Sequence, residues 1–320
     1  MADAERIWVL VDDRAGNRSQ ALGVADRLGR PYTVKEIAYG ALAKLPNALL
    51  GASLLGADAA TRSTIRPPWP ELVIAAGRRT APIALAIKRA SGGKAKLVQI
   101  MNPGLRAAEF ALIARPSHDP GIAGDNVVEI VGAPHGLTAT LLEAARGEWQ
   151  AKLEALPAPR IALIVGGSTR RRRFTDEMAR ELGGRASAMA KAAGGSLMTA
   201  TSRRTGDAVD ALMAAIDCPH HAYRWGDLGD NPYRGYLAWA DAVVVTGDSV
   251  SMCSEACAPG VPVQVFQPPA LITDKHARFH RDLFDGGYAV AFSGVLGETS
   301  PPALDAAGVI AREIERRGLV

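Results

Sequence analysis

The sequence predicts an α/β protein of two Rossmann-like domains that face each other across a cleft. A chain of 320 residues is long for one core and natural for two domains of roughly 150 residues each. Short apolar segments alternate with helical patterns along the chain, which is typical of a parallel sheet covered on both faces. A strand, a glycine-containing loop and a helix also open each half, which favours tandem domains of similar design.

In the first half, the opening strand is Ile7–Val11, and a helical pattern follows from Asn17 to Leu28. Another helix is expected over Thr80–Ala90. Further apolar strands are expected at residues 72–75, 97–100, 110–113 and 127–130.

The pattern restarts after Leu156–Pro159, which is typical of a stiff linker. A strand at Ile161–Val165 enters a Gly166-Gly167 loop, and a long helix follows to about Ala193. Later elements are expected as a strand at 242–245, a helix at 251–258 and a strand at 261–266.

These patterns predict an N-terminal domain over residues 1–155 and a C-terminal domain over residues 160–300. The tail from Ala303 to Arg317 is expected to form one helix. In two-domain folds of this kind such a helix often crosses back, so residues 303–320 are expected to join the first domain.

Composition narrows the class of protein. Hydrophobic residues make up 48% and charged residues 22%, as in ordinary globular proteins, and the net charge of +4 favours anionic partners without indicating nucleic acid. Three cysteines predict a reducing compartment and no disulfide framework. No signal peptide is apparent, and Leu45–Ala57 is shorter than the ~20 residues of a membrane span. We expect a cytoplasmic protein, at most bound to the inner face of a membrane.

Thr246–Glu255 is the segment most suggestive of chemistry. It lies at the carboxyl end of a predicted strand and opens a helix, where free backbone N–H groups and the helix dipole attract anions. Small residues would let a diphosphate approach the backbone, and Glu255 could accept hydrogen bonds from ribose hydroxyls. The alternative is an ordinary βα turn, with Ser249 or Ser251 as the N-cap and Glu255 solvated.

This half resembles the donor-binding half of the peptidoglycan N-acetylglucosaminyltransferase over roughly residues 160–290. The resemblance rests on Tyr236–Val245, Ser254-Glu255-Ala256, Gly260-Val261-Pro262 and Val165-Gly166-Gly167-Ser168. It implies that Glu255 holds the donor ribose and that the Trp225–Leu228 loop, with Trp225 and Leu228 at its ends, lies beside the base. The remaining donor-side residues that it implies are Gly166, Gly167, Ser168, Gly247, Ser249, Val250 and Ser251.

Over the whole chain the sequence resembles the Elm-type mitochondrial-fission family, which is widespread in bacteria. The matching motifs are Asp12-Asp13 with Gly16–Gly23, Gly77–Pro82 and Met101–Gly104. The resemblance implies a GT-B-like fold, and fold likeness alone does not establish a reaction.

The first-domain loop lacks the histidine of the peptidoglycan enzyme. It carries Asp13, Gly16, Asn17 and Gln20, which follow a strand and are expected to face a crevice. Other candidates for a general base are His118 and Asp119, since a neighbouring carboxylate can tune an imidazole near neutral pH. The alternative is a polar turn before Pro120.

Arg170–Arg173 follow the Gly166-Gly167-Ser168 loop. Facing a cleft, each could add a charge-assisted phosphate bond of about 1.5–3 kcal/mol. Facing water, they would form a solvated helix entrance. We expect one of the four, represented by Arg170, to contact phosphate, together with Arg78 or Arg79.

Other motifs are incomplete. No strand precedes G-x-G-x-x-G, and Gly92-Gly93-Lys94 lacks the rest of a P-loop. Gly247–Val250 is similar to the nucleophile block of GDSL-type lipases, but the second glycine of a nucleophile elbow is absent. Cys253 and Cys257 are too few ligands for a metal site, so core packing is expected. Neither a metal nor a cofactor is predicted.

The sequence therefore predicts a GT-B-like glycosyltransferase that binds a nucleotide-diphosphate sugar, UDP-linked, and transfers the sugar to a lipid or glycan acceptor. The alternatives are a non-catalytic binding protein on this fold and a sugar-nucleotide epimerase, which would need a carboxylate pair in the cleft. The apolar segment Tyr39–Leu55 predicts peripheral membrane contact, with a buried helix as its alternative.

Overall fold

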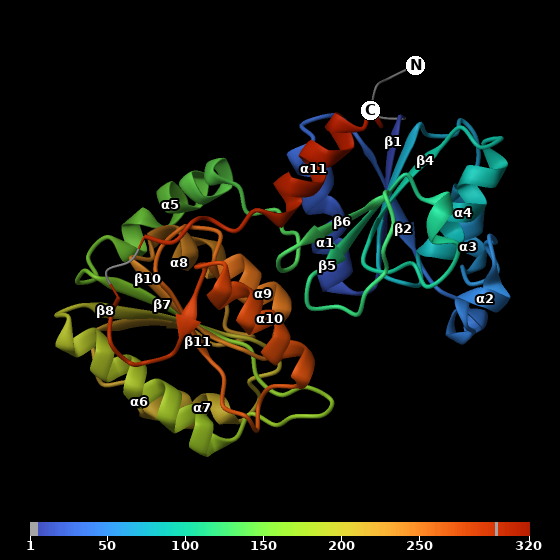
Figure 1. Ribbon diagram of the computed structural model, residues 1–320. Helices are drawn as coiled ribbons and strands as arrows, with labels where there is room; N and C mark the ends of the chain where they lie inside the picture. The colour runs from blue at the N-terminus through green and yellow to red at the C-terminus, as the bar shows by residue number, and fades with distance from the viewer. Residues whose placement is uncertain (1–5, 298–299) are drawn as a thin grey trace. The chain divides into compact units, whose positions relative to one another are not determined.

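The computed structural model describes residues 6–297 and 300–320, which divide into two compact α/β units (Figure 1). Unit 1 runs to Gly136 and regains the chain at Asp305–Val320, and unit 2 is Leu137–Leu304. Each unit contains one parallel six-stranded sheet with alternating helices. The predicted pair of Rossmann-like domains is thereby confirmed.

The sheet of unit 1 has the strand order β2-β1-β3-β4-β5-β6, and all neighbouring strands are parallel. Its strands are β1 (Ile7–Asp12), β2 (Thr33–Ile37), β3 (Leu72–Ala76), β4 (Lys96–Ile100), β5 (Leu112–Pro116) and β6 (Val127–Ile130). Its helices are α1 (Ala15–Arg27), the 3-10 helix η2 (Ala41–Lys44), α2 (Asn47–Leu50), α3 (Ala59–Thr64), α4 (Ala81–Ala90), the 3-10 helix η3 (Ala107–Glu109) and α11 (Ala306–Arg316).

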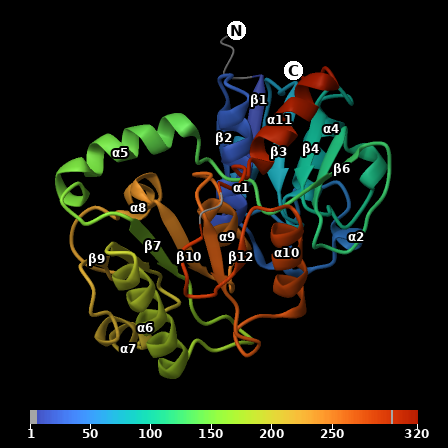
Figure 2. The same ribbon diagram turned by 60° about the vertical axis from the view of Figure 1, so that its left-hand side comes forward.

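The sheet of unit 1 is covered on both faces (Figures 1 and 2). Val9 of β1 points to a cluster that includes residues of α1 and Ile310 and Ile314 of α11. The next residue, Leu10, points to the opposite cluster, which includes Ile83 of α4. Because successive side chains of a strand alternate between faces, the apolar run Ile7–Val11 of β1 is buried on both sides of the sheet.

The sheet of unit 2 has the order β12-β11-β10-β7-β8-β9 and is also parallel. Its strands are β7 (Arg160–Val165), β8 (Ser196–Thr201), β9 (His220–Tyr223), β10 (Ala242–Thr246), β11 (Val263–Phe266) and β12 (Val290–Ala291). Its helices are α5 (Ala139–Leu153), α6 (Asp176–Ala192), α7 (Ala208–Ala214), α8 (Tyr233–Trp239), α9 (Val250–Ala256) and α10 (Asp274–Asp285).

Helix α5 packs on α8, so residues 137–155 group with unit 2 and not with the first domain, where the sequence placed them. Trp149 is buried, and a Cβ on Gly235 would lie 2.4 Å from its Cγ atom. The indole N–H of Trp239 donates to the carbonyl of Arg146 at 2.8 Å. The expected linker, Leu156–Pro159, therefore lies within unit 2.

Several predicted elements begin later than expected, and for two of them a local contact explains the later start. The strand predicted at residues 110–113 is β5, which starts at Leu112 because Phe110 closes η3 with a hydrogen bond to the carbonyl of Ala107. The helix after Gly167 starts only at Asp176, where the Thr175 side chain accepts from the N–H of Met178 at 3.3 Å. A loop therefore separates the two glycines from α6.

Each sheet contains one point at which the strand order reverses. In unit 1 the chain continues from β1 to β2 on one side and then to β3 on the other. In unit 2 it continues from β7 to β8 and β9 and then crosses to β10. Open α/β sheets bind ligands at the carboxyl ends of the strands beside such a point. We call the carboxyl ends of these central strand pairs the β1/β3 edge in unit 1 and the β7/β10 edge in unit 2.

Candidate functional site

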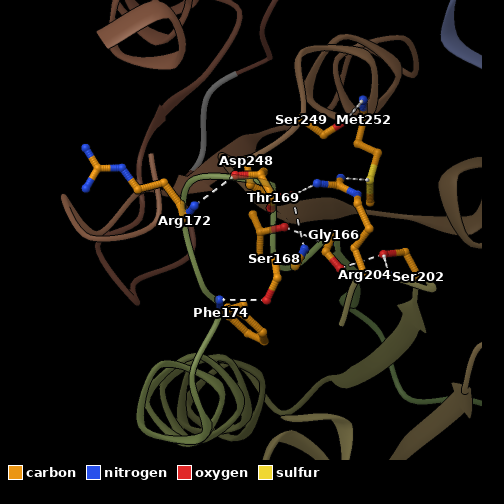
Figure 3. Close-up of polar contacts among 12 residues, drawn as sticks. Gly166, Ser168, Thr169, Arg172, Phe174, Ser202, Arg204, Asp248, Ser249 and Met252 are labelled. Carbon is orange, nitrogen blue, oxygen red and sulfur yellow. Dashed lines mark hydrogen bonds and ion pairs between the residues drawn. The ribbon is translucent and has the colours of Figure 1, made fainter. Parts of the chain in front are cut away.

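At the β7/β10 edge of unit 2, the two glycines after β7 are bonded to the last residue of β10 and to the loop that follows it (Figure 3). The N–H of Gly166 donates to Thr246 Oγ1 at 2.7 Å, and the N–H of Gly167 donates to Asp248 Oδ2 at 3.0 Å. Gly167 has φ +134°, and a Cβ there would lie 2.2 Å from the carbonyl oxygen of Arg204. Only glycine fits this approach of two loops.

Asp248 is the buried acid of this edge. Its side chain is 0% exposed, and its Oδ2 atom pairs with Arg204 Nη1 at 2.6 Å. A Cβ on Gly166 would lie 2.5 Å from that oxygen, so the missing side chain makes room for the carboxylate. Neither member of the pair is among the site residues predicted from the sequence. Arg204 follows β8, which was not predicted as a strand.

The predicted diphosphate loop has the geometry of a capped helix start. Ser249 is the N-cap of α9 and accepts from the N–H of Met252 at 3.4 Å. Val250 and Ser251 are partly exposed beside it. Ser168, from the loop after β7, accepts from the N–H of Phe174 at 3.0 Å. The hydroxyls of Ser249 and Ser168 therefore bind the backbone of their own loops.

Gly247 packs on a buried histidine that the sequence did not suggest. A Cβ on Gly247 would lie 2.5 Å from the His280 Cε1 atom. His280 Nδ1 lies 2.7 Å from Gln267 Oε1, and burial, helped by His276, lowers the pKa of His280 to about 4. The imidazole is therefore neutral near pH 7.

Glu255 is not the solvated helix residue of the alternative interpretation. It is partly buried, and Tyr233 donates its hydroxyl to Glu255 Oε2 at 2.6 Å. Burial raises the pKa of the Glu255 carboxyl, whereas the Tyr233 hydrogen bond and the charge of Arg234 act in the opposite direction. The acid is held in place on α9 by a residue of α8.

The predicted base-side loop and the arginine run lie on the surface of unit 2. Trp225 is 57% exposed and Leu228 is 100% exposed. Arg170–Arg173 are all exposed, and the N–H of Thr169 bonds the carbonyl of Arg172 at 2.8 Å. This loop ends before α6 begins, so Arg170 and its neighbours are neither in the helix nor at its first turn.

At the β1/β3 edge of unit 1, a buried acid is surrounded by donors. Asp12 accepts from the N–H of Arg14, from the Asn17 amide and, at 3.3 Å, from the Tyr39 hydroxyl. Arg79 lies on the ring of Tyr39, 4.2 Å from its centroid. It donates to the exposed Asp13 at 2.8 Å. A hollow beside these acids is lined by Asp12, Asp13, Ala15, Arg18, Glu36, Ile37 and Ala38.

The remaining first-domain candidates differ in accessibility. Gly16 is partly exposed in the first turn of α1, whereas Gln20 is buried and its Oε1 atom lacks a hydrogen-bond partner within the described residues. Arg78 is exposed and donates to Asn47 Oδ1 at 3.2 Å. Gly77, with φ +83°, lies against the Asn17 amide, where a Cβ would be 2.5 Å from its nitrogen.

The three catalytic candidates do not converge at one strand end. His118 is only 3% exposed, and its Nε2 atom lies 4.0 Å from Asp119 Oδ1. Both residues follow β5, whereas Asp13 follows β1. Since β3 and β4 separate these strands, the two strand ends are about 14 Å apart, three spacings of ~4.8 Å. Asp13 and the His118-Asp119 pair are therefore alternative candidates for a base at two different places on the sheet.

The apolar segment Tyr39–Leu55 is not the buried helix of the alternative. It forms η2, α2 and turns, with Ala43 and Leu50 buried. Four leucines stay exposed, namely Leu42 (46%), Leu45 (38%), Leu49 (71%) and Leu55 (54%). We call them the leucine patch. Within the described ranges, no helix has the length and apolar character that crossing a bilayer would require.

Comparisons with known proteins agree with this architecture. The Rickettsia prowazekii (strain Madrid E) protein named Uncharacterized protein RP120 is 31% identical and is matched over 90% of each chain. Mitochondrial fission protein ELM1 of Arabidopsis thaliana is 29% identical, over 84% of this chain and 70% of that protein. Among solved structures, UDP-GlcNAc 2-epimerase from Neisseria meningitidis bound to UDP-GlcNAc has a TM-score of 0.52 and 13% identity, covering 97% of this chain and 99% of the other.

The structural likeness, at so low an identity, shows a shared GT-B-like fold and not a shared reaction. The family described as Mitochondrial fission ELM1 matches residues 15–318, which is nearly the whole chain. The chain therefore belongs to the mitochondrial fission ELM1 family.

Proposed function

We propose that the chain is a GT-B-like glycosyltransferase that binds a UDP-linked sugar at the β7/β10 edge of unit 2. The observation that carries the proposal is the position of the Glu255 carboxylate. Glu255 lies on α9, the helix that follows this edge, and its carboxylate accepts a hydrogen bond from Tyr233 of α8. A carboxylate fixed in this way suits paired ribose hydroxyls, since ionised acceptors form stronger hydrogen bonds than neutral ones. The neighbouring structure bound to UDP-GlcNAc, on a similar fold, supports a nucleotide sugar as ligand.

The proposed donor site uses the remaining predicted residues around this acid. The exposed Trp225 is available to stack on a base, with Leu228 beside it. Residues of the two loops would line the diphosphate, namely Gly166, Gly167, Ser168, Gly247, Ser249, Val250 and Ser251, with Arg170 near by. In unit 1, the acceptor side is proposed at Asp13, Gly16, Asn17, Gln20 and Arg78. The acceptor is a lipid or a glycan.

A UDP-sugar or UDP is expected to stabilise the folded protein. At one hundred times its dissociation constant, a ligand that binds only the folded state adds about 2.7 kcal/mol, which shifts the melting temperature visibly. Differential scanning calorimetry with UDP-GlcNAc, UDP-glucose, UDP and the corresponding guanosine compounds tests this expectation. Melting curves that do not move with any nucleotide diphosphate would remove the proposed donor site.

Glu255→Gln is expected to weaken UDP binding about five- to tenfold without loss of folding. The amide oxygen still accepts from the Tyr233 hydroxyl, whereas the charge-assisted bonds to ribose are lost, a difference of about 1 kcal/mol. Isothermal titration calorimetry measures the affinity. Tyr233→Phe is the matched control, because it keeps the carboxylate and removes only its partner. Equal affinities for wild type and Glu255→Gln would show that the acid does not contact the ligand.

Epimerisation of the nucleotide sugar is the second candidate function. Adjacent carboxylates, Asp12 and Asp13, lie at the β1/β3 edge of unit 1, and such a pair is what proton removal and return at a sugar carbon would need. NMR of the sugar after incubation with UDP-GlcNAc separates the candidates. Appearance of an isomer favours epimerisation, whereas slow release of UDP favours transfer to water. Tight binding with no turnover favours a binding protein.

We also propose that the leucine patch binds a membrane surface. Leu49→Ser is expected to reduce co-flotation with anionic phospholipid vesicles at low salt by about tenfold, because burying a leucine side chain contributes about 1.5–3 kcal/mol. Leu228→Ser, which changes a fully exposed leucine of unit 2, is the control and is expected to float like wild type. Wild-type protein that stays at the bottom of the gradient would make a soluble acceptor the better proposal.

A further inference from the structure

The ion pair between Arg204 and Asp248 uses only part of each group (Figure 3). The guanidinium meets the carboxylate through one nitrogen, Nη1, and its Nη2 atom lies 3.8 Å from the sulfur of Met252, a weak acceptor. Asp248 Oδ1 is buried and has no hydrogen-bond partner among the described residues. An arginine and a carboxylate commonly form two parallel hydrogen bonds, and this pair forms one.

The two side chains differ in access to solvent. Asp248 is 0% exposed and Arg204 is 32% exposed, so the guanidinium can be reached from solvent and the carboxylate cannot. The backbone of Arg204 is fixed on both sides, since its carbonyl accepts from Ser168 N–H at 2.8 Å and its N–H donates to Ser202 Oγ at 3.1 Å. The side chain can therefore change partner while the loop stays in place.

We propose that Arg204 binds the diphosphate group of the ligand and that Asp248 holds the guanidinium when no ligand is present. This inference rests on the proposed nucleotide-sugar site and adds the cation that it requires. A diphosphate offers several oxygens in a geometry that a guanidinium fork matches. On binding, Arg204 turns from one buried oxygen to the ligand, and Asp248 keeps the hydrogen bond from Gly167 N–H.

Asp248 would then compete with the diphosphate of the ligand for the Arg204 guanidinium. Its negative charge opposes the binding of a phosphate at this edge, whereas the exposed Arg170–Arg173 of the adjoining loop favour it. Apparent affinity is scaled by the fraction of molecules in which the binding group is available. Neutralising Asp248 should therefore tighten binding, whereas a purely structural ion pair gives no such gain.

The test compares Asp248→Asn, the double variant Arg204→Gln/Asp248→Asn and wild type, with inorganic pyrophosphate and UDP as probes in isothermal titration calorimetry. Asp248→Asn is expected to bind both about tenfold more tightly than wild type. The double variant leaves no unpaired charge behind, so it is expected to fold. Because it lacks Arg204, it is expected to lose the affinity for pyrophosphate and UDP that Asp248→Asn gains. Circular dichroism and thermal melting confirm that each variant is folded.

The matched control is Asp210→Asn. Asp210 Oδ1 pairs with Arg224 Nη1 at 2.8 Å on the surface of the same unit, so this change frees an arginine and alters the net charge equally. It is expected to leave pyrophosphate affinity unchanged. An Asp248→Asn variant that binds no more tightly than wild type or Asp210→Asn would overturn the inference.

The probes separate the two proposals. If wild type binds UDP and the Asp248 and Arg204 changes have no effect, the inference fails and the donor site stands. If Asp248→Asn gains pyrophosphate binding that needs Arg204, but no variant prefers UDP over pyrophosphate or binds a UDP-sugar, the anion site stands and the proposed function fails. Absence of binding in every variant overturns both.

Discussion

Gly167→Ala is expected to lower the free energy of unfolding by about 3 kcal/mol or more. At φ +134° an alanine is strained, which costs of order 1–3 kcal/mol. In addition, its Cβ would lie 2.2 Å from the carbonyl oxygen of Arg204, a backbone atom that cannot move without shifting the loop after β8. Urea denaturation followed by circular dichroism measures the loss, provided that the transition of unit 2 is resolved.

Gly184→Ala is the control for this change. Gly184 lies inside α6, where a Cβ meets no atom within 4 Å, so alanine is expected to stabilise the helix by up to about 1 kcal/mol. Opposite signs at the two glycines would establish that the loss at Gly167 comes from its conformation and its neighbours. A Gly167→Ala protein as stable as wild type would mean that the two loops do not approach so closely.

Trp149→Ala is expected to destabilise unit 2 by about 3–5 kcal/mol, as truncation of a buried tryptophan usually does. The indole fills the space above Gly235, so its removal leaves a cavity between α5 and α8. Calorimetry should show the transition of unit 2 moving down by about 10 °C. A shift confined to the transition of unit 1 would instead place α5 with the first domain.

Trp225→Ala is the matched control, since this tryptophan is 57% exposed. Its removal is expected to change stability by no more than about 0.5 kcal/mol. If Trp225 stacks on the base, the same variant binds UDP more weakly than wild type, while its affinity for inorganic pyrophosphate is unchanged. Equal loss for both probes would contradict the stacking role.

The central strands could be predicted because burial on both faces leaves a continuous apolar run. Strands β1, β3, β7 and β10 all show it. The edge strands β2 and β9 show no such run, since they are mostly half-buried and contain residues such as Glu36 and His220. Strand β8 is wholly buried, but its Ser196, Thr199 and Thr201 conceal the pattern. Local periodicity cannot recover such strands.

Two local features of the candidate site could be predicted from the sequence. The glycine turn after β7 and the cap at Ser249 are encoded within a few residues. Arg204 and Tyr233 were missed because their partners, Asp248 and Glu255, come from other segments that only the folded sheet brings near. His118 was proposed as a base because the chain alone does not reveal that its ring is buried.

The position of α11 has a consequence for the order in which the molecule is made. Unit 1 needs Ile310 and Ile314 to complete the cluster under α1, so it lacks part of its core until the last helix has been synthesised. Unit 2 is contiguous, and its whole sequence leaves the ribosome before that helix. Since domains generally fold as units during synthesis, the later half of the protein can reach its native state first, while the earlier half waits for the tail.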